Sequence, residues 1–293
     1  DYGKYDDFRE DHIIINNLAN NLEAPYQAFL AQSLVKKNEL FIYRYHHEHG
    51  SAWVVFYNPI QAKLKLPRRL DEKLIRKLGR ELARFHRACT NICNQLPNAS
   101  KTVVTDIHKL MKSVNNNEIK MCPDHKSMVL KHCDIFLENA DKVNYITDFE
   151  VIPVFIDWNI GNFSIDTNGK FFSRWDYDWF RMSSRVMDFY FFSRVCSDIG
   201  DRTVFSYLVD PLMEDRFVMF LKEYHRIYPL TEPEVRLIKE AYRFFILNYV
   251  IKDGPYFFRK TYSNKLAREA YDIYLPAIET NYDVEKILRA LKI

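Results

Sequence analysis

Apolar residues recur at helical spacing over most of the chain. Residues 5–22 carry one apolar stripe, which predicts a helix that ends before Ala24-Pro25. A stronger amphipathic stripe occupies residues 69–93, with leucines on one face and lysines and arginines on the other. Further helices are predicted at residues 103–111, 127–137, 205–228, 232–250, 266–278 and 284–291.

Short runs of β-branched and aromatic residues predict strands between these helices. Three such runs follow the first helix, at residues 27–33, 40–45 and 53–57. In the middle of the chain, residues 151–156 are typical of a buried strand, although Pro153 suggests an edge or the start of the strand. Strands at one end and helices over the rest predict an α+β protein.

A β-hairpin is predicted directly after that middle strand. Residues 163–165 and 170–175 flank Asn168-Gly169, and an Asn-Gly pair is the strongest short hairpin signal. If Asn168 and Gly169 are the centre of the turn, Asn162 faces Trp175. The side chains of Asn162 and Asp176 then emerge side by side, close to the loop that carries Asp157.

An acid, an amide and a second acid therefore converge on one site. ATP-dependent phosphoryl transfer needs one carboxylate to orient a hydroxyl and oxygen ligands for Mg²⁺. Asp157 can supply the first, and Asn162 with Asp176 can supply the second. The isolated spacing Asp-x-x-x-x-Asn occurs by chance in many proteins, so the hairpin and the second aspartate carry the argument.

These motifs resemble those of the aminoglycoside phosphotransferase and choline kinase-like superfamily, which has a protein-kinase-like fold. The matching segments are residues 155–162, residues 174–179 and Met187-Asp188-Phe189. The resemblance implies that Asp157 is the catalytic base, that Asn162 and Asp176 bind the metal, and that Asp188 is a buried structural carboxylate at a helix start. It also implies ATP and Mg²⁺ as cofactors. Phe155 departs from the family pattern, which has histidine there.

The resemblance further implies two lobes. Residues 1–58 would form a small, incomplete N-lobe with a helix and short strands, and residues 59–293 a large helical C-lobe with the catalytic loop and metal-binding hairpin. Glu10 is then the candidate for the carboxylate that pairs with a nucleotide-binding lysine. Lys4 lies too close before it to be that partner, and seven glycines form no Gly-rich phosphate loop. Either the first strands are absent from this chain or it has lost standard nucleotide handling.

Aromatic and acidic residues alternate after the second metal ligand. Rings and carboxylates suit a cationic ligand through cation–π contact and charge, so Trp158, Asp178 and Trp179 are candidate substrate contacts. The leading hypothesis is a kinase for a hydroxyl of a small molecule such as an aminoglycoside or choline. A non-catalytic kinase-like binding protein and a protein Ser/Thr kinase of the same superfamily are the alternatives.

Composition and charge argue against several other classes of protein, namely nucleic-acid-binding, membrane-spanning and zinc-binding proteins. A formal charge of +3 is too balanced to indicate a nucleic-acid partner. The five irregularly spaced cysteines favour reduced thiols and a cytoplasmic location, and no apolar run is long enough to span a membrane. The histidines of residues 46–49 lack the four well-spaced ligands of a zinc site, and His86 is expected to be buried among leucines.

Overall fold

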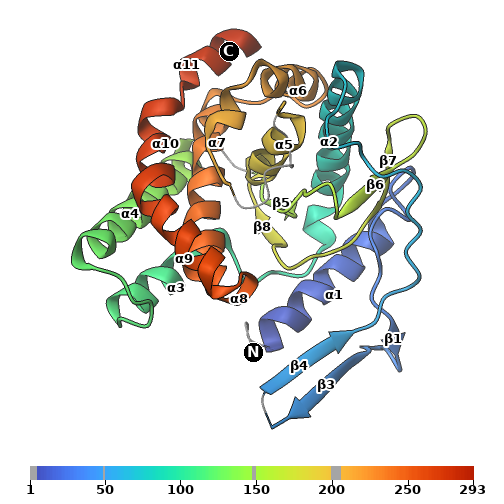
Figure 1. Cartoon of the computed structure of the whole chain (residues 1–293). Coiled ribbons are helices and arrows are strands. Elements are labelled where there is room, and N and C mark those ends of the chain that lie inside the picture. The colour runs from blue at the N-terminus through green and yellow to red at the C-terminus, as the bar shows by residue number, and fades with distance from the viewer. Residues whose placement is uncertain (1–4, 49, 147–149, 199–205) are drawn as a thin grey trace.

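The computed structural model describes residues 5–48, 50–146, 150–198 and 206–293 (Figure 1). Lys4 and His49 lie outside these ranges. The helices are α1 (Tyr5–Asn21), α2 (Glu72–Ile92), α3 (Val103–Asn115), α4 (Pro123–Ile146), α5 (Phe189–Cys196), α6 (Asp215–Ile227), α7 (Glu232–Phe245), α8 (Gly254–Phe257), α9 (Lys260–Glu269), α10 (Leu275–Asn281) and α11 (Val284–Leu291). The strands are β1 (Val35–Lys36), β2 (Glu39–Leu40), β3 (Ile42–His47), β4 (Gly50–Val55), β5 (Ile152–Val154), β6 (Phe163–Ile165), β7 (Phe171–Arg174) and β8 (Arg181–Ser183).

Helices predicted from strong apolar stripes are confirmed. Helix α1 differs from the prediction by one residue at its end, and α11 has the predicted bounds. Helix α2 begins three residues later than predicted because the Asp71 side chain accepts a hydrogen bond from the backbone N–H of Leu74 and so caps the helix.

The weaker predictions need correction. Residues 27–33 form turns and isolated bridges rather than a strand. Helix α6 begins at Asp215, after a short helical turn at Asp210–Met213, and the predicted start at Phe205 lies outside the described residues. The helix predicted at residues 266–278 is instead α9, a π-helical turn and α10 in succession.

All four β-sheets among the described residues are antiparallel pairs. β1 pairs with β2, β3 with β4, β5 with β8, and β6 with β7. Pro153 is tolerated in β5 because a strand of a two-stranded sheet has one free edge. Strand β8 has no counterpart among the predictions, since its three residues give too short a pattern to recognise.

The core lies between helices of the large helical part. Helices α2 and α6 are the most closely packed pair, and Gly79 makes this possible because a Cβ there would stand 2.4 Å from the Phe220 carbonyl oxygen. Helices α4 and α7 pack together on the other side (Figure 1). Among the described residues, no helix is both long and apolar enough to cross a membrane.

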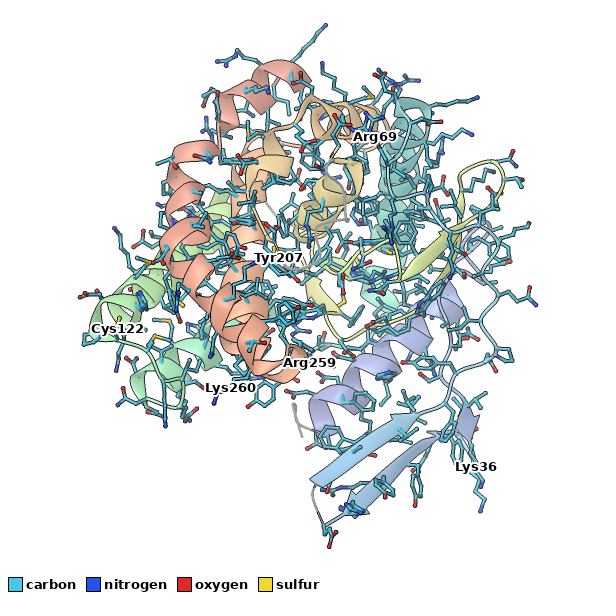
Figure 2. The ribbon with its side chains drawn as sticks, in the orientation of Figure 1. Lys36, Arg69, Cys122, Tyr207, Arg259 and Lys260 are labelled. Carbon is cyan, nitrogen blue, oxygen red and sulfur yellow. The ribbon has the colours of Figure 1, made fainter. Side chains whose placement is uncertain are left out.

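Helix α1 and the β3–β4 hairpin lie together at one end of the molecule (Figure 1). The hairpin turns Trp53 towards α1, where its ring contacts those of Tyr5 and Phe8. Lys36 projects from the outer edge of this region (Figure 2). A small β-containing part therefore adjoins a large helical part, and the boundary near Asn58-Pro59 stays a prediction.

Candidate functional site

Asp157 lies in the loop that follows β5, where the sequence predicts it. Its Oδ2 accepts a hydrogen bond from the Asn162 side-chain amide at 3.1 Å, and its Oδ1 accepts one from the Asn159 backbone N–H at 3.2 Å. The preceding Ile156 has φ of +59°, which is strained for a β-branched residue. The loop is thus held in an unusual conformation that presents a half-buried carboxylate.

Asp188 supports this loop from below. One of its carboxylate oxygens accepts hydrogen bonds from the backbone N–H groups of Phe155 and Ile156, at 2.9 and 2.7 Å. The other lies 3.0 Å from Nε2 of His86, and both side chains are fully buried. Burial lowers the pKa of His86. Asp188 lies just before α5, yet its carboxylate bonds to the backbone of the Asp157 loop rather than capping that helix.

The β6–β7 hairpin brings Asn162 next to Asp176. The Trp175 backbone N–H donates to the Asn162 carbonyl at 3.0 Å, so these two residues face each other as the sequence predicts. The turn itself differs from the prediction, because residues 167–169 form a three-residue loop with Gly169 at φ of +77°. A bulge beside Ile165 absorbs the extra residue and restores the register.

Asp176 is exposed at the end of this hairpin, with φ of +66°. The Asn162 amide nitrogen is directed to Asp157, which leaves its side-chain oxygen free to act as a ligand. One amide oxygen and one carboxylate fit Mg²⁺, which is commonly bound by one or two protein oxygens together with waters and phosphate. Within the described ranges, no group of three or more His, Cys, Asp or Glu residues has metal-binding geometry.

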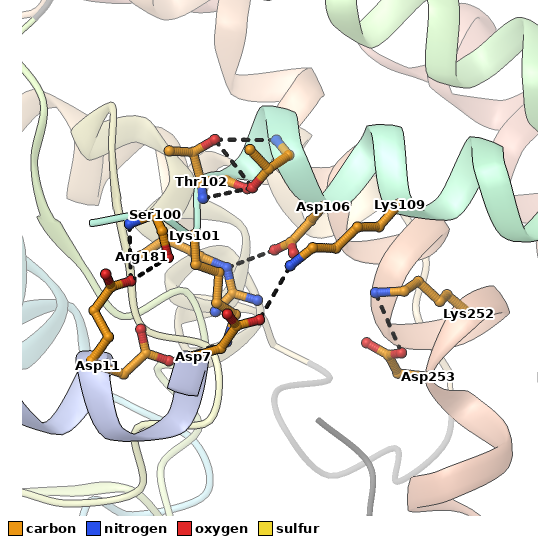
Figure 3. A network of polar contacts seen from close by, with 12 residues as sticks. Asp7, Asp11, Ser100, Lys101, Thr102, Asp106, Lys109, Arg181, Lys252 and Asp253 are labelled. Atoms are coloured by element: carbon orange, nitrogen blue, oxygen red, sulfur yellow. Dashed lines mark hydrogen bonds and ion pairs between the residues drawn. The ribbon is translucent and has the colours of Figure 1, made fainter. Parts of the chain in front are cut away.

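A cavity of about 520 Å³ lies beside Asp178, between α1, β4, α3 and the residues before α8. Figure 3 shows the charged residues that line it. The ion pairs in this lining are Asp7–Lys109 at 3.2 Å, Asp11–Lys101 at 3.1 Å, Asp106–Arg181 at 2.6 Å and Asp253–Lys252 at 3.7 Å. Asp178 adds a carboxylate that has no ion-pair partner among the described residues. The cavity therefore has one more acid than base.

The electrostatics of Asp178 reflect this position. Its side chain reaches solvent, but the surrounding protein disfavours the charged form and raises the pKa of Asp178. The negative charge of Asp176 raises that pKa further. A cation in the cavity would relieve both effects.

Comparisons with known proteins identify the architecture. No protein-family model matches the sequence, and no curated protein matches it. Among solved structures, the amicoumacin kinase hAmiN in complex with AMP-PNP and Ca²⁺ has a TM-score of 0.61 at 15% identity, over 97% of this chain and 82% of that one. The ADP-bound aminoglycoside phosphotransferase APH(2'')-Ib has a TM-score of 0.51 at 16% identity, over 94% and 85%. The macrolide 2'-phosphotransferase MphH from Brachybacterium faecium has a TM-score of 0.50 at 10% identity, over 92% and 80%.

The chain has a kinase-like fold. The resemblance to the aminoglycoside phosphotransferase superfamily and the predicted α+β class are therefore confirmed at the level of the fold. At identities this low the likeness concerns architecture, and chemistry has to be argued from the side chains of this chain.

Glu10 lies on α1 and forms no ion pair with a lysine among the described residues. Its carboxylate accepts hydrogen bonds from the backbone N–H and hydroxyl of Ser100, at 2.9 and 2.6 Å. The neighbouring Asp11 pairs instead with Lys101, which comes from the connection between α2 and α3. Glu10 thus joins α1 to the helical part of the molecule.

Trp158 and Trp179 occupy the core of the kinase-like fold. Trp158 is completely buried and packs against Phe29, Phe163 and Phe171, so its ring offers no face to a substrate. Trp179 is 4% exposed and contacts aromatic rings that follow α7. The prediction that Trp158 and Trp179 contact the substrate is therefore corrected, because both rings are buried in the core. Asp178, the third predicted substrate contact, lines a cavity.

Sequence reasoning missed two side chains near the site. Arg174 is fully buried beneath the Asp157 loop, and Lys101 reaches Asp11 across the cavity. Arg174 follows Phe171 and Phe172 on the predicted strand at residues 170–175, and this apolar run is the signal that could have indicated its burial. Lys101 gives no such signal, because its partner is ninety positions away.

Proposed function

We propose that this protein is an ATP- and Mg²⁺-dependent phosphotransferase that acts on a hydroxyl of a small molecule. The observation that supports it best is the arrangement of Asp157, Asn162 and Asp176 on adjoining segments of a kinase-like fold. The matched structures include AMP-PNP and ADP complexes, which are consistent with a nucleotide donor.

The proposed roles follow from the geometry. Asp157 orients the acceptor hydroxyl and takes its proton, and the Asn162 amide fixes the carboxylate through the 3.1 Å hydrogen bond. Asn162 and Asp176 would hold Mg²⁺, which when bound neutralises charge on phosphate oxygens. Asp188 keeps the loop in place through two backbone hydrogen bonds.

A cationic acceptor is the proposed substrate class, with an aminoglycoside or choline as examples. The support is Asp178, the carboxylate without an ion-pair partner among the described residues that line the cavity. The cavity volume of about 520 Å³ falls within the usual range of small-molecule pockets.

Five free cysteines agree with a cytoplasmic location.

The test is a phosphotransfer assay with Mg-ATP and a panel of amino alcohols and aminoglycosides. Asp157→Ala and Asp176→Ala should each lower kcat by roughly 10²–10⁴-fold. Asp124→Ala, which removes an exposed carboxylate from α4, is the matched control and should retain full activity. Full phosphotransfer by the Asp157 and Asp176 variants would refute the proposal.

A non-catalytic kinase-like binding protein is the second candidate. Phe155 in place of the family histidine and the bonding of Glu10 to Ser100 favour it. Calorimetry separates the two: nucleotide binding with no turnover of any small molecule or peptide hydroxyl would favour the binding protein. Turnover of a peptide serine alone would favour the protein kinase alternative.

A further inference from the structure

Arg174 places a fully buried guanidinium directly below the candidate catalytic loop. The residue is the last of β7 and stands two positions before Asp176, and its exposed fraction is 0%. It also lies at a junction of the backbone, since its N–H donates to the Phe29 carbonyl at 2.6 Å and its carbonyl accepts from the Ala31 N–H at 2.9 Å.

The guanidinium contacts the loop in two ways. Its Nη2 donates a hydrogen bond to the Asp157 carbonyl oxygen at 3.0 Å. Its central carbon lies 4.6 Å from the ring centre of Phe155 and 4.4 Å from that of Trp158. Phe155 therefore offers the cation an aromatic face, and a desolvated contact of this kind is favourable.

Arg174 differs from three other buried arginines in what neutralises it. Arg181, Arg185 and Arg243 each form an ion pair with a carboxylate, at 2.6, 2.6 and 2.7 Å. Arg174 forms none with the described residues, and its Nε and Nη1 groups are buried without an acceptor there. Burying a charge in this way costs free energy, and burial accordingly lowers the pKa of Arg174.

The negative charges that face this cation belong to the candidate site. The carboxylates that act most strongly on the Arg174 cation are those of Asp157 and Asp188, followed by that of Asp176. The cation thus lies among the loop acid, the acid that caps the loop and the metal-binding acid. An apolar side chain could fill the same space without the cost of burying a charge, so packing does not explain an arginine here.

We propose that Arg174 is a positioning residue that couples the Asp157 loop to the metal-binding strand. Its hydrogen bond to the Asp157 carbonyl oxygen fixes the loop backbone. Because the arginine belongs to the strand that continues into Asp176, one side chain sets the position of the base relative to the metal site. The inference rests on the proposed phosphotransferase function.

Arg174→Met separates positioning from packing. We expect the free energy of unfolding to stay the same or rise, because methionine fills the space without burying a charge. In contrast, kcat should fall roughly 10–100-fold with little change in KM, since a misplaced loop costs rate.

Two further variants sharpen the result. Arg174→Lys keeps the charge and a hydrogen-bond donor and should recover part of the lost kcat. Arg243→Met is the matched control, because Arg243 is equally buried but paired with Glu240 on α7. That control should lower stability while leaving kcat per folded molecule unchanged.

Hydrogen exchange gives a readout that does not depend on turnover. If Arg174 positions the loop, Arg174→Met and Arg174→Lys should exchange the amides of residues 156–162 faster, in that order, with unchanged exchange in α2 and α6. Equal exchange of these amides in wild type and Arg174→Met would overturn the inference. A loss of kcat that is fully explained by a loss of folded protein would overturn it as well. A wild-type protein without phosphotransfer would refute the proposed function alone, and the exchange result would still decide the role of Arg174.

Discussion

The two longest hairpins among the described residues, β3–β4 and β6–β7, are both rich in aromatic residues but differ in burial. In β3–β4 the side chains of Tyr43 and Tyr45 are 57% and 48% exposed. In β6–β7, Phe163 is 1% exposed and Ser164 is fully buried. The candidate site stands on the second hairpin. Both hairpins have strand-forming sequences, so strand propensity does not distinguish the one that carries the candidate site. Burial does distinguish it.

The difference comes from the neighbours of each edge. Both edges of β6–β7 are hydrogen-bonded, on one side by Leu64 to Ile165 at 3.0 and 3.1 Å, and on the other by Phe29 to Arg174. For β3, the only strand partner among the described residues is β4. A hairpin bonded at both edges can hold Asn162 and Asp176 to a fixed geometry.

The largest difference between the two hairpins in the free energy of unfolding is expected when an aromatic ring is removed from the buried β6–β7 hairpin. Phe163→Ala deletes a side chain packed against Trp158 and Phe171 and should lower the free energy of unfolding by about 3–5 kcal/mol. Urea unfolding at constant pH measures this. A loss below about 1 kcal/mol would mean that the hairpin does not depend on its burial.

A smaller effect is expected at the turn of the same hairpin. Gly169 has φ of +77°, and a Cβ there would stand 3.0 Å from Cδ of Lys77, so Gly169→Ala should cost roughly 1–2 kcal/mol. Gly161→Ala is the control, because its Cβ would meet only Asn159 at an ordinary 3.5 Å. Equal stability of the two variants in urea would argue against the three-residue turn.

The third effect depends on pH and concerns the small β-containing part. His12 lies 2.6 Å from the Tyr57 hydroxyl, and burial lowers the pKa of His12. As pH falls through about 6.5, the unfolded chain binds a proton that folded His12 does not, so stability falls by at most about 1.4 kcal/mol per pH unit. His12→Gln should therefore show a shallower decline than wild type between pH 7.5 and 5.5 in denaturant titrations. An unchanged slope would exclude His12 as a contributor.

The smallest effect is expected on the exposed face of β3–β4. Tyr43→Thr places a β-branched residue with high strand propensity in β3 and should change the free energy of unfolding by less than about 0.5 kcal/mol. Chemical denaturation beside Phe163→Ala tests the comparison within one experiment. A loss above about 2 kcal/mol would show that this face is packed in solution.

The register of the β6–β7 hairpin shows how far sequence reasoning reaches. Turn residues and strand lengths predicted that Asn162 faces Trp175, and this is confirmed. The Asn168-Gly169 pair predicts a two-residue turn, whereas the turn has three residues. The bulge beside Ile165 compensates for the extra residue, so the predicted pairing of Asn162 with Trp175 still holds. Nothing in the local sequence pattern indicates this bulge.

The alternation of acids and aromatic rings from Asp176 to Trp179 shows the limit of what sequence reasoning can predict. A period of two separates acids from rings, and the structure does expose Asp176 and Asp178 while burying Tyr177 and Trp179. That Asp178 lines a cavity depends on α1 and α3, which are far away in the chain. The sequence could not assign the rings to the core for this reason.

The sequence by itself determined the helices, the α+β class and the local order of Asp157, Asn162 and Asp176, because these depend on periodicity, turn chemistry and short spacings. Only the tertiary structure decided that Glu10 bonds to Ser100, that Trp158 is buried and that Arg174 lies beneath Asp157. These contacts join residues from segments that are separated in the chain. Packing of whole elements fixes such contacts, and no local pattern encodes them.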